Sequence, residues 1–323
     1  MDIQYLLFLQ GLRDQAPGWI NQFLMWISEF TISPVIMLIP ALFFWCVCKR
    51  DGVFLLFGYG LGNLANGIVK LTACVYRPWI KDPSVNSLLK TSATGYSFPS
   101  GHTTDAVVLY GGTGAIFGRK HAWIFWIMLV PILLVGFARN WLGCHTPQDV
   151  VVGLLMTAAI MVLLWQLMKW LEKHPSKDLL VAGIGLVVCV ATLIYVMIKP
   201  YPVDYAADGS ILVDPIKMWP DTFASIGFCI GMFCGWIVER RAIRFSLDVS
   251  LKERIVRGVL GFIVGYILMT FLLGSLEAAL GSVWGTFCTY LIYAIYIFIV
   301  FPACIKLWDV CGERRKTMQA EGH

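Results

Sequence analysis

Charged side chains are scarce in this sequence. They make up 14% of the 323 residues, whereas hydrophobic residues make up 58%, and the mean hydropathy is +0.73. This balance excludes an ordinary soluble domain, because the helices of a soluble protein would carry a polar face that most of these apolar runs lack. The sequence therefore predicts an all-α fold, a polytopic membrane bundle of helices.

Features of several other protein classes are also absent. The ten cysteines show no close-paired spacing typical of a metal site, and most of them lie inside apolar runs. The N-terminus has neither a basic start nor a small-residue cleavage site, so we expect no removed signal peptide. Cys74 and Cys144 both flank polar loops, and a pairing between these two residues stays open.

Long apolar runs dominate what is present, each near the length that crosses about 30 Å of hydrocarbon. The segment before the first run has mixed polarity and two tryptophans, which is typical of a helix lying along a membrane surface. Nine runs are predicted to span the membrane: 30–48, 53–74, 101–118, 122–139, 149–170, 179–198, 222–238, 255–275 and 283–304.

The Lys and Arg residues are unevenly distributed between the two sides of the predicted bundle. Sixteen lie in the loops after spans one, three, five and seven or in the C-terminal tail, and five lie on the opposite side. By the positive-inside rule, the side with sixteen cations is cytoplasmic. The net charge of +5 is therefore a topology signal, and we expect no nucleic-acid partner.

Three polar clusters lie on the side that is otherwise poor in cations. They occur in or beside the loops after spans two and four, so all three can meet at one membrane interface. The clusters are KLTACVYRP with Lys70 and Arg77, SFPSGH with His102, and ARNWLGCHTPQD with Arg139, His145 and Asp149.

Local patterns in these clusters predict how their side chains are presented. Lys70 and Arg77 are seven residues apart, so on a continuous helix they would share one face, and Pro78 would mark the helix end. Ser100 is placed to cap the helix that follows it. Taken singly, these residues also fit simpler roles, such as a snorkelling lysine or a capping acid at Asp149.

The combination of residue types indicates an anion site. Adjacent Arg and Lys side chains would repel a divalent ion, so we expect no metal and no other cofactor. Cations and backbone N–H groups instead bind phosphate, and two histidines beside a phosphoryl group can divide the nucleophile and acid roles. The clusters therefore predict phosphate binding with histidine-based phosphoryl transfer.

The same residues resemble the signature of the type 2 phosphatidic acid phosphatase superfamily, which includes lipid phosphate phosphatases, glucose-6-phosphatase and vanadium haloperoxidases. The resemblance covers about residues 20–170, and Ala138 departs from it where the family usually has a small hydroxyl residue or glycine. The matching positions are Lys70, Arg77 and Pro78, then Pro99, Ser100, Gly101 and His102, then Arg139, His145 and Asp149.

The resemblance implies two groups of site residues. In the first group, Lys70, Arg77 and Arg139 hold the phosphate oxygens. Ser100 and the backbone N–H of Gly101 donate to the same oxygens.

The second group carries the chemistry that the resemblance implies. His145 attacks phosphorus to form a phosphohistidine, and Asp149 fixes the tautomer of His145. His102 protonates the leaving oxygen. Asp105 lies outside the matching positions, one turn into the third span, where an acidic residue is usually functional, and it either hydrogen-bonds His102 or lines the cavity.

The resemblance also implies an organisation and a function. We divide the chain into an N-terminal interfacial segment (1–29), a phosphatase-like core (30–170), and additional spans with a cytoplasmic tail (171–323). We expect a metal-independent membrane phosphatase that hydrolyses a lipid phosphate, such as phosphatidic acid or an isoprenoid diphosphate, facing outside a bacterial plasma membrane or the lumen of the endoplasmic reticulum. The alternatives are a sugar phosphatase like glucose-6-phosphatase, a lipid phosphotransferase, and a lipid or anion transporter; no oligomeric state is assigned.

Overall fold

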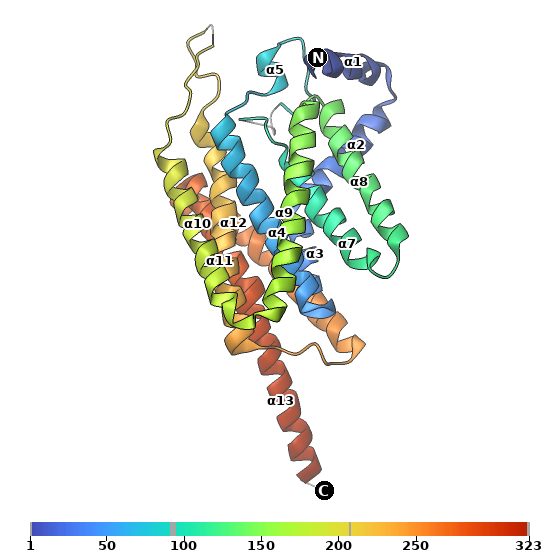
Figure 1. The fold of residues 1–323 in the computed structure, drawn as a ribbon, viewed down its shortest axis with the longest axis vertical. Coiled ribbons are helices and arrows are strands. Elements are labelled where there is room, and N and C mark those ends of the chain that lie inside the picture. Colours follow the sequence, from blue (N-terminus) through green and yellow to red (C-terminus); the bar gives the residue numbers. More distant parts are fainter. Residues whose placement is uncertain (1, 91–94, 207, 322–323) are drawn as a thin grey trace.

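The computed structural model describes residues 2–90, 95–206 and 208–321, and helices make up most of this part of the chain (Figure 1). The predicted all-α class is confirmed. The helical elements are α1 (Asp2–Gln15), α2 (Gly18–Ile32), α3 (Pro34–Leu42), η1 (Phe43–Val47), α4 (Lys49–Ala73), α5 (Pro78–Lys81), α6 (Gly101–Ala106), η2 (Val107–Gly111), α7 (Gly112–Gly118), α8 (Ala122–Trp141), α9 (Pro147–Lys173), η3 (Pro175–Lys177), α10 (Asp178–Ile198), η4 (Pro215–Met218), α11 (Trp219–Val238), η5 (Glu239–Ile243), α12 (Leu251–Ile295), η6 (Tyr296–Val300) and α13 (Phe301–Glu321).

The expected count of nine spans is not confirmed. Within the described residues, six helices are long and apolar enough to cross a membrane, or seven if the bent pair Gly18–Ile32 and Ile36–Val47 forms one span. The segment 101–118 consists of the short elements α6, η2 and α7. The last two predicted spans belong to a single helical run over 251–311.

That last run folds back on itself at Gly281. The φ angle of Gly281 is 77°, a left-handed conformation that glycine adopts without strain from a Cβ. The hydroxyl of Tyr296 donates to the carbonyl of Gly261 at 2.8 Å, and a Cβ on Gly285 would lie 2.6 Å from the backbone of Glu277. Residue numbers rise along one arm as they fall along the other, so the arms are antiparallel.

Helices α4 and α11 form the centre of the bundle. In the most apolar stretch of each helix, 67% of the residues are buried inside the protein. The corresponding share is 28% for α8 and for α9. Small residues allow this close packing, since a Cβ on Gly67 of α4 would lie 2.7 Å from Thr222 Oγ1 of α11. Gly153 allows an equally close approach where α9 crosses the start of α6, because a Cβ added at this position would lie 2.9 Å from the Ser100 carbonyl oxygen.

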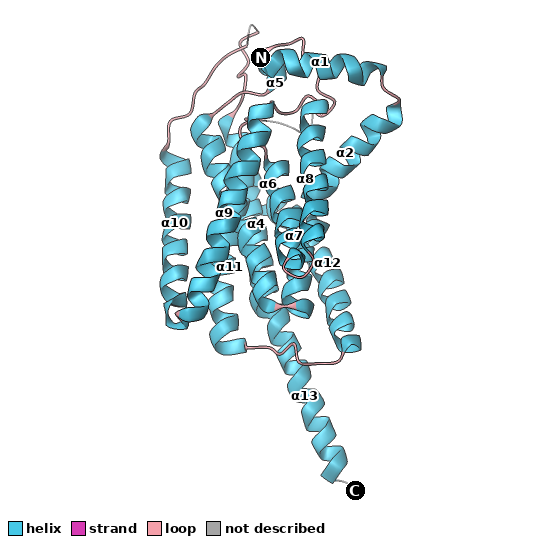
Figure 2. Ribbon diagram, turned by 45° about the vertical axis from the view of Figure 1, so that its right-hand side comes forward, coloured by secondary structure: helices cyan, strands magenta, loops and turns pink. Residues whose placement is uncertain are grey.

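The N-terminal helices pack on one end of the bundle. Helix α1 lies across that end in both views, and α13 projects from the opposite end (Figures 1 and 2). Arg13 of α1 is buried and donates to the carbonyls of Asn86, at 2.7 Å, and Trp141, at 3.3 Å. One arginine thereby joins the loop after α4 to the end of α8, which are two of the segments that carry the polar clusters.

Candidate active site

The three polar clusters meet in one cavity of about 400 Å³. Most of the predicted site residues line it, from α4, α6, α8 and the two intervening loops. Those residues are Lys70, Arg77, Gly101, His102, Asp105, Arg139 and His145. The prediction that residues of all three clusters come together is therefore confirmed, while Ser100 and Asp149 lie directly behind this wall.

His145 sits in the tight connection between α8 and α9, where it is 2% exposed. An Nη1 hydrogen of Arg77 points at His145 Nε2 across 2.9 Å. Arginine only donates, so Nε2 is the acceptor and the proton of the neutral ring lies on Nδ1. On its other side, Nδ1 is 3.5 Å from Asp149 Oδ2 and 3.4 Å from Ser97 Oγ. The arrangement presents the lone pair of Nε2 on the cavity side.

The electrostatic surroundings keep His145 neutral. Burial, followed by the nearby Arg77 and Arg139 cations, lowers the pKa of His145 well below its usual value of 6.5. Burial and repulsion by Arg139 also lower the pKa of Arg77, to about 10, which still leaves this guanidinium charged at neutral pH. The site therefore combines fixed positive charge with an uncharged imidazole.

The carboxylate of Asp149 both caps helix α9 and faces His145. Its Oδ2 accepts the backbone N–H of Thr146 at 2.8 Å, and its own N–H donates to Thr146 Oγ1, so the simple capping interpretation is correct for α9. The same Oδ2 accepts the hydroxyl of Ser97 and faces His145. Ser97 was missed by the sequence analysis, although it opens the quoted SFPSGH segment.

Arg139 and His102 share a partner that the sequence analysis also missed. Glu29 of α2 places its Oε1 3.8 Å from Arg139 Nη1 and 3.8 Å from His102 Nε2. Arg139 is further held by the hydroxyl of Ser28, which accepts from Nη1 at 2.9 Å. Residue 29, at which the sequence divides the interfacial segment from the core, thus lies inside a helix that lines the cavity.

The presentation of Lys70 and Arg77 differs from the prediction. Helix α4 ends at Ala73, and Cys74 follows in a left-handed conformation with a φ of 49°. Arg77 therefore reaches the cavity from an extended loop and not from a shared helix face, while Pro78 opens α5. Lys70 makes no hydrogen bond or ion pair within the described part of the chain, so its ammonium group lines the cavity uncommitted.

Ser100 occupies the N-cap position of α6, but its side chain makes no capping hydrogen bond, which corrects the predicted cap. Its hydroxyl is buried without a hydrogen-bond partner among the residues described. Its backbone N–H donates to the carbonyl of Asp149 at 3.0 Å, which ties the start of α6 to the start of α9. Gly101 next to it is open, since a Cβ there would meet only Asn66 Oδ1, at 4.0 Å.

Asp105 lines the cavity and does not bond to His102. Its Oδ1 accepts from Asn63 Nδ2 of α4 at 2.7 Å. Asn66, one turn further along α4, donates to Thr104 Oγ1 at 3.1 Å. These amides join α4 to α6, as expected for interhelical hydrogen bonds.

The opposite wall of the cavity comes from the second half of the chain, for which the sequence predicted no role. Five polar side chains from η4, α11 and α12 line it: Lys217, Asp221, Thr222, Ser225 and Tyr290. Asp221 adds a third carboxylate to the cavity lining, beside those of Glu29 and Asp105. The later helices therefore complete the cavity that the three clusters begin.

No group of three or more His, Cys, Asp or Glu side chains is arranged to hold a metal ion anywhere in the described ranges. Cys74 and Cys144 are both free thiols. Cys144 instead lends its backbone carbonyl to the site, where it accepts from Arg77 Nη1 at 3.0 Å.

Two family profiles match this chain. The profile of the PAP2 superfamily covers residues 51–173, and the profile of the PAP2 superfamily phosphatase transmembrane extension covers residues 223–309. The chain belongs to the PAP2 superfamily. The first PAP2 match contains all three polar clusters, and the second contains Ser225 and Tyr290, so both matched segments of this PAP2 chain line the same cavity.

Several characterised proteins are similar to this PAP2 chain over part of their length. It is 36% identical to the bacitracin transport permease protein BcrC of Bacillus licheniformis, over 25% of this chain and 37% of that protein. It is 26% identical to an undecaprenyl-diphosphatase of Sulfolobus acidocaldarius, over 33% and 50% of the two chains. It is 28% identical to phosphatidylglycerophosphatase B of Bacillus subtilis, over 42% and 68%. No solved structure matches the chain.

Proposed function

We propose that this PAP2 protein is a membrane phosphatase that hydrolyses a lipid phosphate or isoprenoid diphosphate through a phosphohistidine at His145. The main observation that supports this proposal is the position of His145 between Arg77 and Asp149. Arg77 at 2.9 Å from Nε2 supports the Nδ1–H tautomer, and the carboxylate of Asp149 lies behind that proton. A buried neutral imidazole with its lone pair toward a cationic cavity suits attack on phosphorus.

In the first step, the phosphate oxygens bind to Lys70, Arg77 and Arg139. Arg77 transfers its hydrogen bond from Nε2 to a phosphate oxygen, which frees the lone pair for attack. His102 enters this step protonated, with the Glu29 carboxylate 3.8 Å away to balance its charge. The new N–P bond forms as the P–O bond to the lipid breaks, and His102 gives its proton to the departing oxygen. The cations stabilise the charge that develops on the phosphoryl oxygens.

In the second step, water attacks the phosphohistidine. His102, now neutral, accepts the proton of that water, and the N–P bond breaks to release phosphate and His145. Asp149 stabilises the positive charge on the His145 ring throughout, as the carboxylate of a hydrolase triad does. Ser97, which donates to Asp149, holds this carboxylate in position.

The substrate class follows from the place of the cavity and from the relatives. A cavity at the end of membrane-spanning helices suits a substrate whose phosphate is hydrated while its chain stays in hydrocarbon. Two relatives are named for the hydrolysis of undecaprenyl diphosphate and of phosphatidylglycerol phosphate, which supports a lipid. A soluble sugar phosphate was suggested by the similarity of a nine-span chain to glucose-6-phosphatase. Because the count of nine spans is not confirmed, this alternative has less support.

The proposed sidedness rests on charge. The sixteen cations of the basic loops and tail support a cytoplasmic location for the end of the bundle from which α13 projects. The candidate active site would then face the outside of a plasma membrane.

The test is phosphate release by the full chain in detergent. The substrates are phosphatidic acid, undecaprenyl diphosphate, phosphatidylglycerol phosphate and glucose 6-phosphate. We expect the wild type to favour a lipid, and His145→Ala to lose about 10⁴-fold or more in turnover because the nucleophile is gone.

The matched control is His121→Ala, which changes an exposed histidine between α7 and α8 and should leave turnover unaltered. Normal activity in His145→Ala would remove the assignment of the nucleophile. No release by the wild type from any of the four substrates would overturn hydrolysis and favour phosphoryl transfer to an acceptor, or transport.

A further inference from the structure

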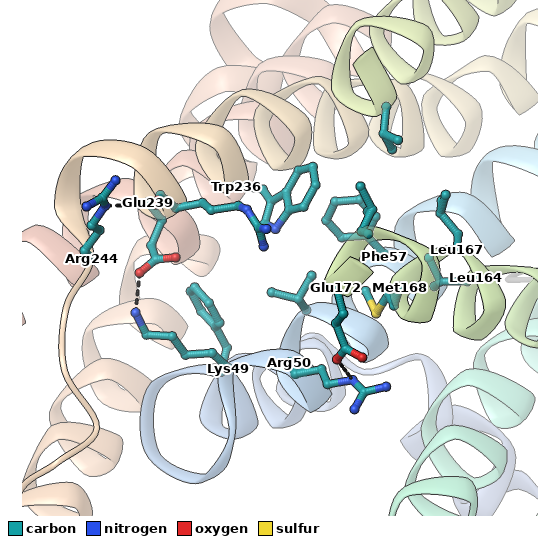
Figure 3. Close-up of a pocket in the computed structure, with 15 residues that line it drawn as sticks. Lys49, Arg50, Phe57, Leu164, Leu167, Met168, Glu172, Trp236, Glu239 and Arg244 are labelled. Atoms are coloured by element: carbon teal, nitrogen blue, oxygen red, sulfur yellow. Dashed lines mark hydrogen bonds and ion pairs between the residues drawn. The ribbon is translucent and has the colours of Figure 1, made fainter. Parts of the chain in front are cut away.

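A second cavity, of about 310 Å³, is drawn in Figure 3. It lies at the opposite end of α4 and α9 from the candidate active site. It opens between the first turn of α4, the last turns of α9, and the end of α11 with η5. Its volume falls within the range of small-molecule sites, roughly 300–1,000 Å³. None of the proposed catalytic residues lines it.

The rim of this cavity is charged, with an excess of cations. Two carboxylates, Glu172 and Glu239, accompany four cations on it. The cations are Lys49, Arg50, Arg240 and Arg244. Helix α4 also begins at Lys49, so the positive end of its dipole lies at the same rim.

Three of the four rim cations are held in place by carboxylates. Lys49 pairs with Glu239 at 2.5 Å and Arg50 pairs with Glu172 at 2.9 Å, as the dashed lines in Figure 3 mark. Arg240 pairs with Asp178 at 3.1 Å. These pairs fix the shape of the rim without cancelling its charge.

Arg244 is the exception among the rim cations. It is exposed, and its Nε donates only to the carbonyl of Arg240, at 3.3 Å, with no carboxylate partner in the described ranges. Its φ of 52° places a non-glycine residue in the left-handed region, an unfavourable conformation that is enriched at binding sites. The structure thus holds one uncommitted guanidinium at the mouth of the cavity.

The floor of the cavity is apolar and reaches between the helices. Phe57, Leu164, Met168 and Trp236 form it, and each is less than 9% exposed. The rim residues on α4 and α9 lie just outside the predicted spans 53–74 and 149–170, whereas the floor residues of these helices lie inside them. The rim is therefore at the level of lipid headgroups and the floor at the level of the chains.

We propose that this cavity binds an anionic phospholipid, with its phosphate headgroup on the basic rim and part of one chain on the apolar floor. A free anion would use the rim but not the floor, and an uncharged lipid would use the floor but not the rim. Basic pockets between membrane helices on the cytoplasmic side bind anionic headgroups in this way. The lipid bound here is a resident ligand and not the substrate.

The experiment is native mass spectrometry of the full chain in detergent, titrated with phosphatidylglycerol, phosphatidylcholine or the water-soluble glycerol 3-phosphate. We expect one phosphatidylglycerol to be retained in preference to phosphatidylcholine. Arg244→Ala should weaken this binding about tenfold, because a charge-assisted hydrogen bond is lost. The matched control, Lys252→Ala, removes an exposed cation near the start of α12 that does not line the cavity, and should bind normally.

Two further variants locate the lipid. Val181→Trp, on the half-buried side of the floor, should weaken phosphatidylglycerol binding while leaving the rim intact. Lys70→Ala removes a cation from the candidate active site and should leave this lipid bound. Melting temperatures near that of the wild type confirm that each variant is folded.

Each remaining outcome overturns the proposal. Equal retention of phosphatidylcholine would exclude a headgroup site, and equal binding of glycerol 3-phosphate would exclude the chain. Equal losses in Arg244→Ala and Lys252→Ala would reduce the effect to general surface charge, and loss in Lys70→Ala would assign the lipid to the other cavity. Because the measurement is binding, its outcome is independent of whether the chain is a phosphatase.

Discussion

The two cavities at opposite ends of α4 differ in how their cations are balanced. At the end with the second cavity, Lys49, Arg50 and Arg240 have carboxylate partners within 3.1 Å. At the other end, Lys70 has no such partner in the described ranges, and Arg139 is 3.8 Å from its nearest carboxylate, that of Glu29. Similar residue types are therefore balanced differently at the two ends.

The difference lies in what faces the cations. In the candidate active site, Arg77 contacts the imidazole of His145 at 2.9 Å, so a cation and the proposed nucleophile share one hydrogen bond. In the second cavity, three of the four cations contact carboxylates, and no histidine lines it. The first arrangement suits binding and attack on a phosphoryl group, whereas the second suits retention of an anion without chemistry.

The largest predicted effect of this difference comes from removing one arginine at each end. Arg77→Ala should lower turnover about 10²- to 10³-fold, because Arg77 both stabilises the phosphoryl oxygens and sets the His145 tautomer. Arg240→Ala makes the same charge change in the second cavity and should leave turnover within about threefold, since Asp178 keeps Arg241 as a partner at 2.5 Å. Initial rates with the best lipid substrate test both, and equal losses would remove the distinction between the cavities.

A smaller effect is expected in the pH dependence of the site. Protonation of His145 would add a positive charge to a buried ring that lies beside Arg77 and Arg139, which lowers the pKa of His145. The ring therefore stays neutral at pH 6.5 and somewhat below. Turnover should therefore persist as the pH falls through 6.5, and decline only below that value. In Arg77→Ala one cause of the lowered pKa is lost, so the His145 pKa should rise while burial still holds it below 6.5.

Rate profiles of the wild type and ¹⁵N-histidine NMR of Arg77→Ala measure these two shifts. A wild-type acid limb centred at or above the usual value of 6.5 would contradict the neutral nucleophile. An unchanged His145 titration in the variant would contradict the electrostatic role of Arg77.

The sequence was sufficient to predict the central residues of the site. Lys70 and Arg139 lie near the ends of α4 and α8, and Arg77 and His145 lie in the loops that follow them. Their side chains line one cavity because alternate connections of membrane helices return to the same end. The prediction that Lys70 and Arg77 share one helix face was wrong, because Cys74, in a left-handed conformation, ends α4 before Arg77. Local spacing thus predicted residues that line one cavity, but for an incorrect local reason.

The rest of the site depends on contacts between distant segments. Glu29 has no local signature, and its position follows from α2 packing on α8 through the hydrogen bond of Arg139 to Ser28. Asp221 and Tyr290 reach the cavity because α11 and the α12 hairpin pack beside α4. Periodicity and motif spacing carry no information on such pairings.

The smallest predicted effect compares one carboxylate at each end. In Glu29→Gln, a negative charge 3.8 Å from Arg139 and His102 is removed, so an incoming phosphate no longer competes with it. We expect KM and the inhibition constant of vanadate, a phosphate mimic, to fall about two- to fivefold, the size of a partly exposed ion pair, with a smaller change in kcat. Glu172→Gln makes the same substitution beside Arg50 in the second cavity and should leave both constants unaltered. A rise in KM for Glu29→Gln would instead make Glu29 part of the phosphate-binding geometry, because its loss would then disorder Arg139 and His102, the two side chains beside it.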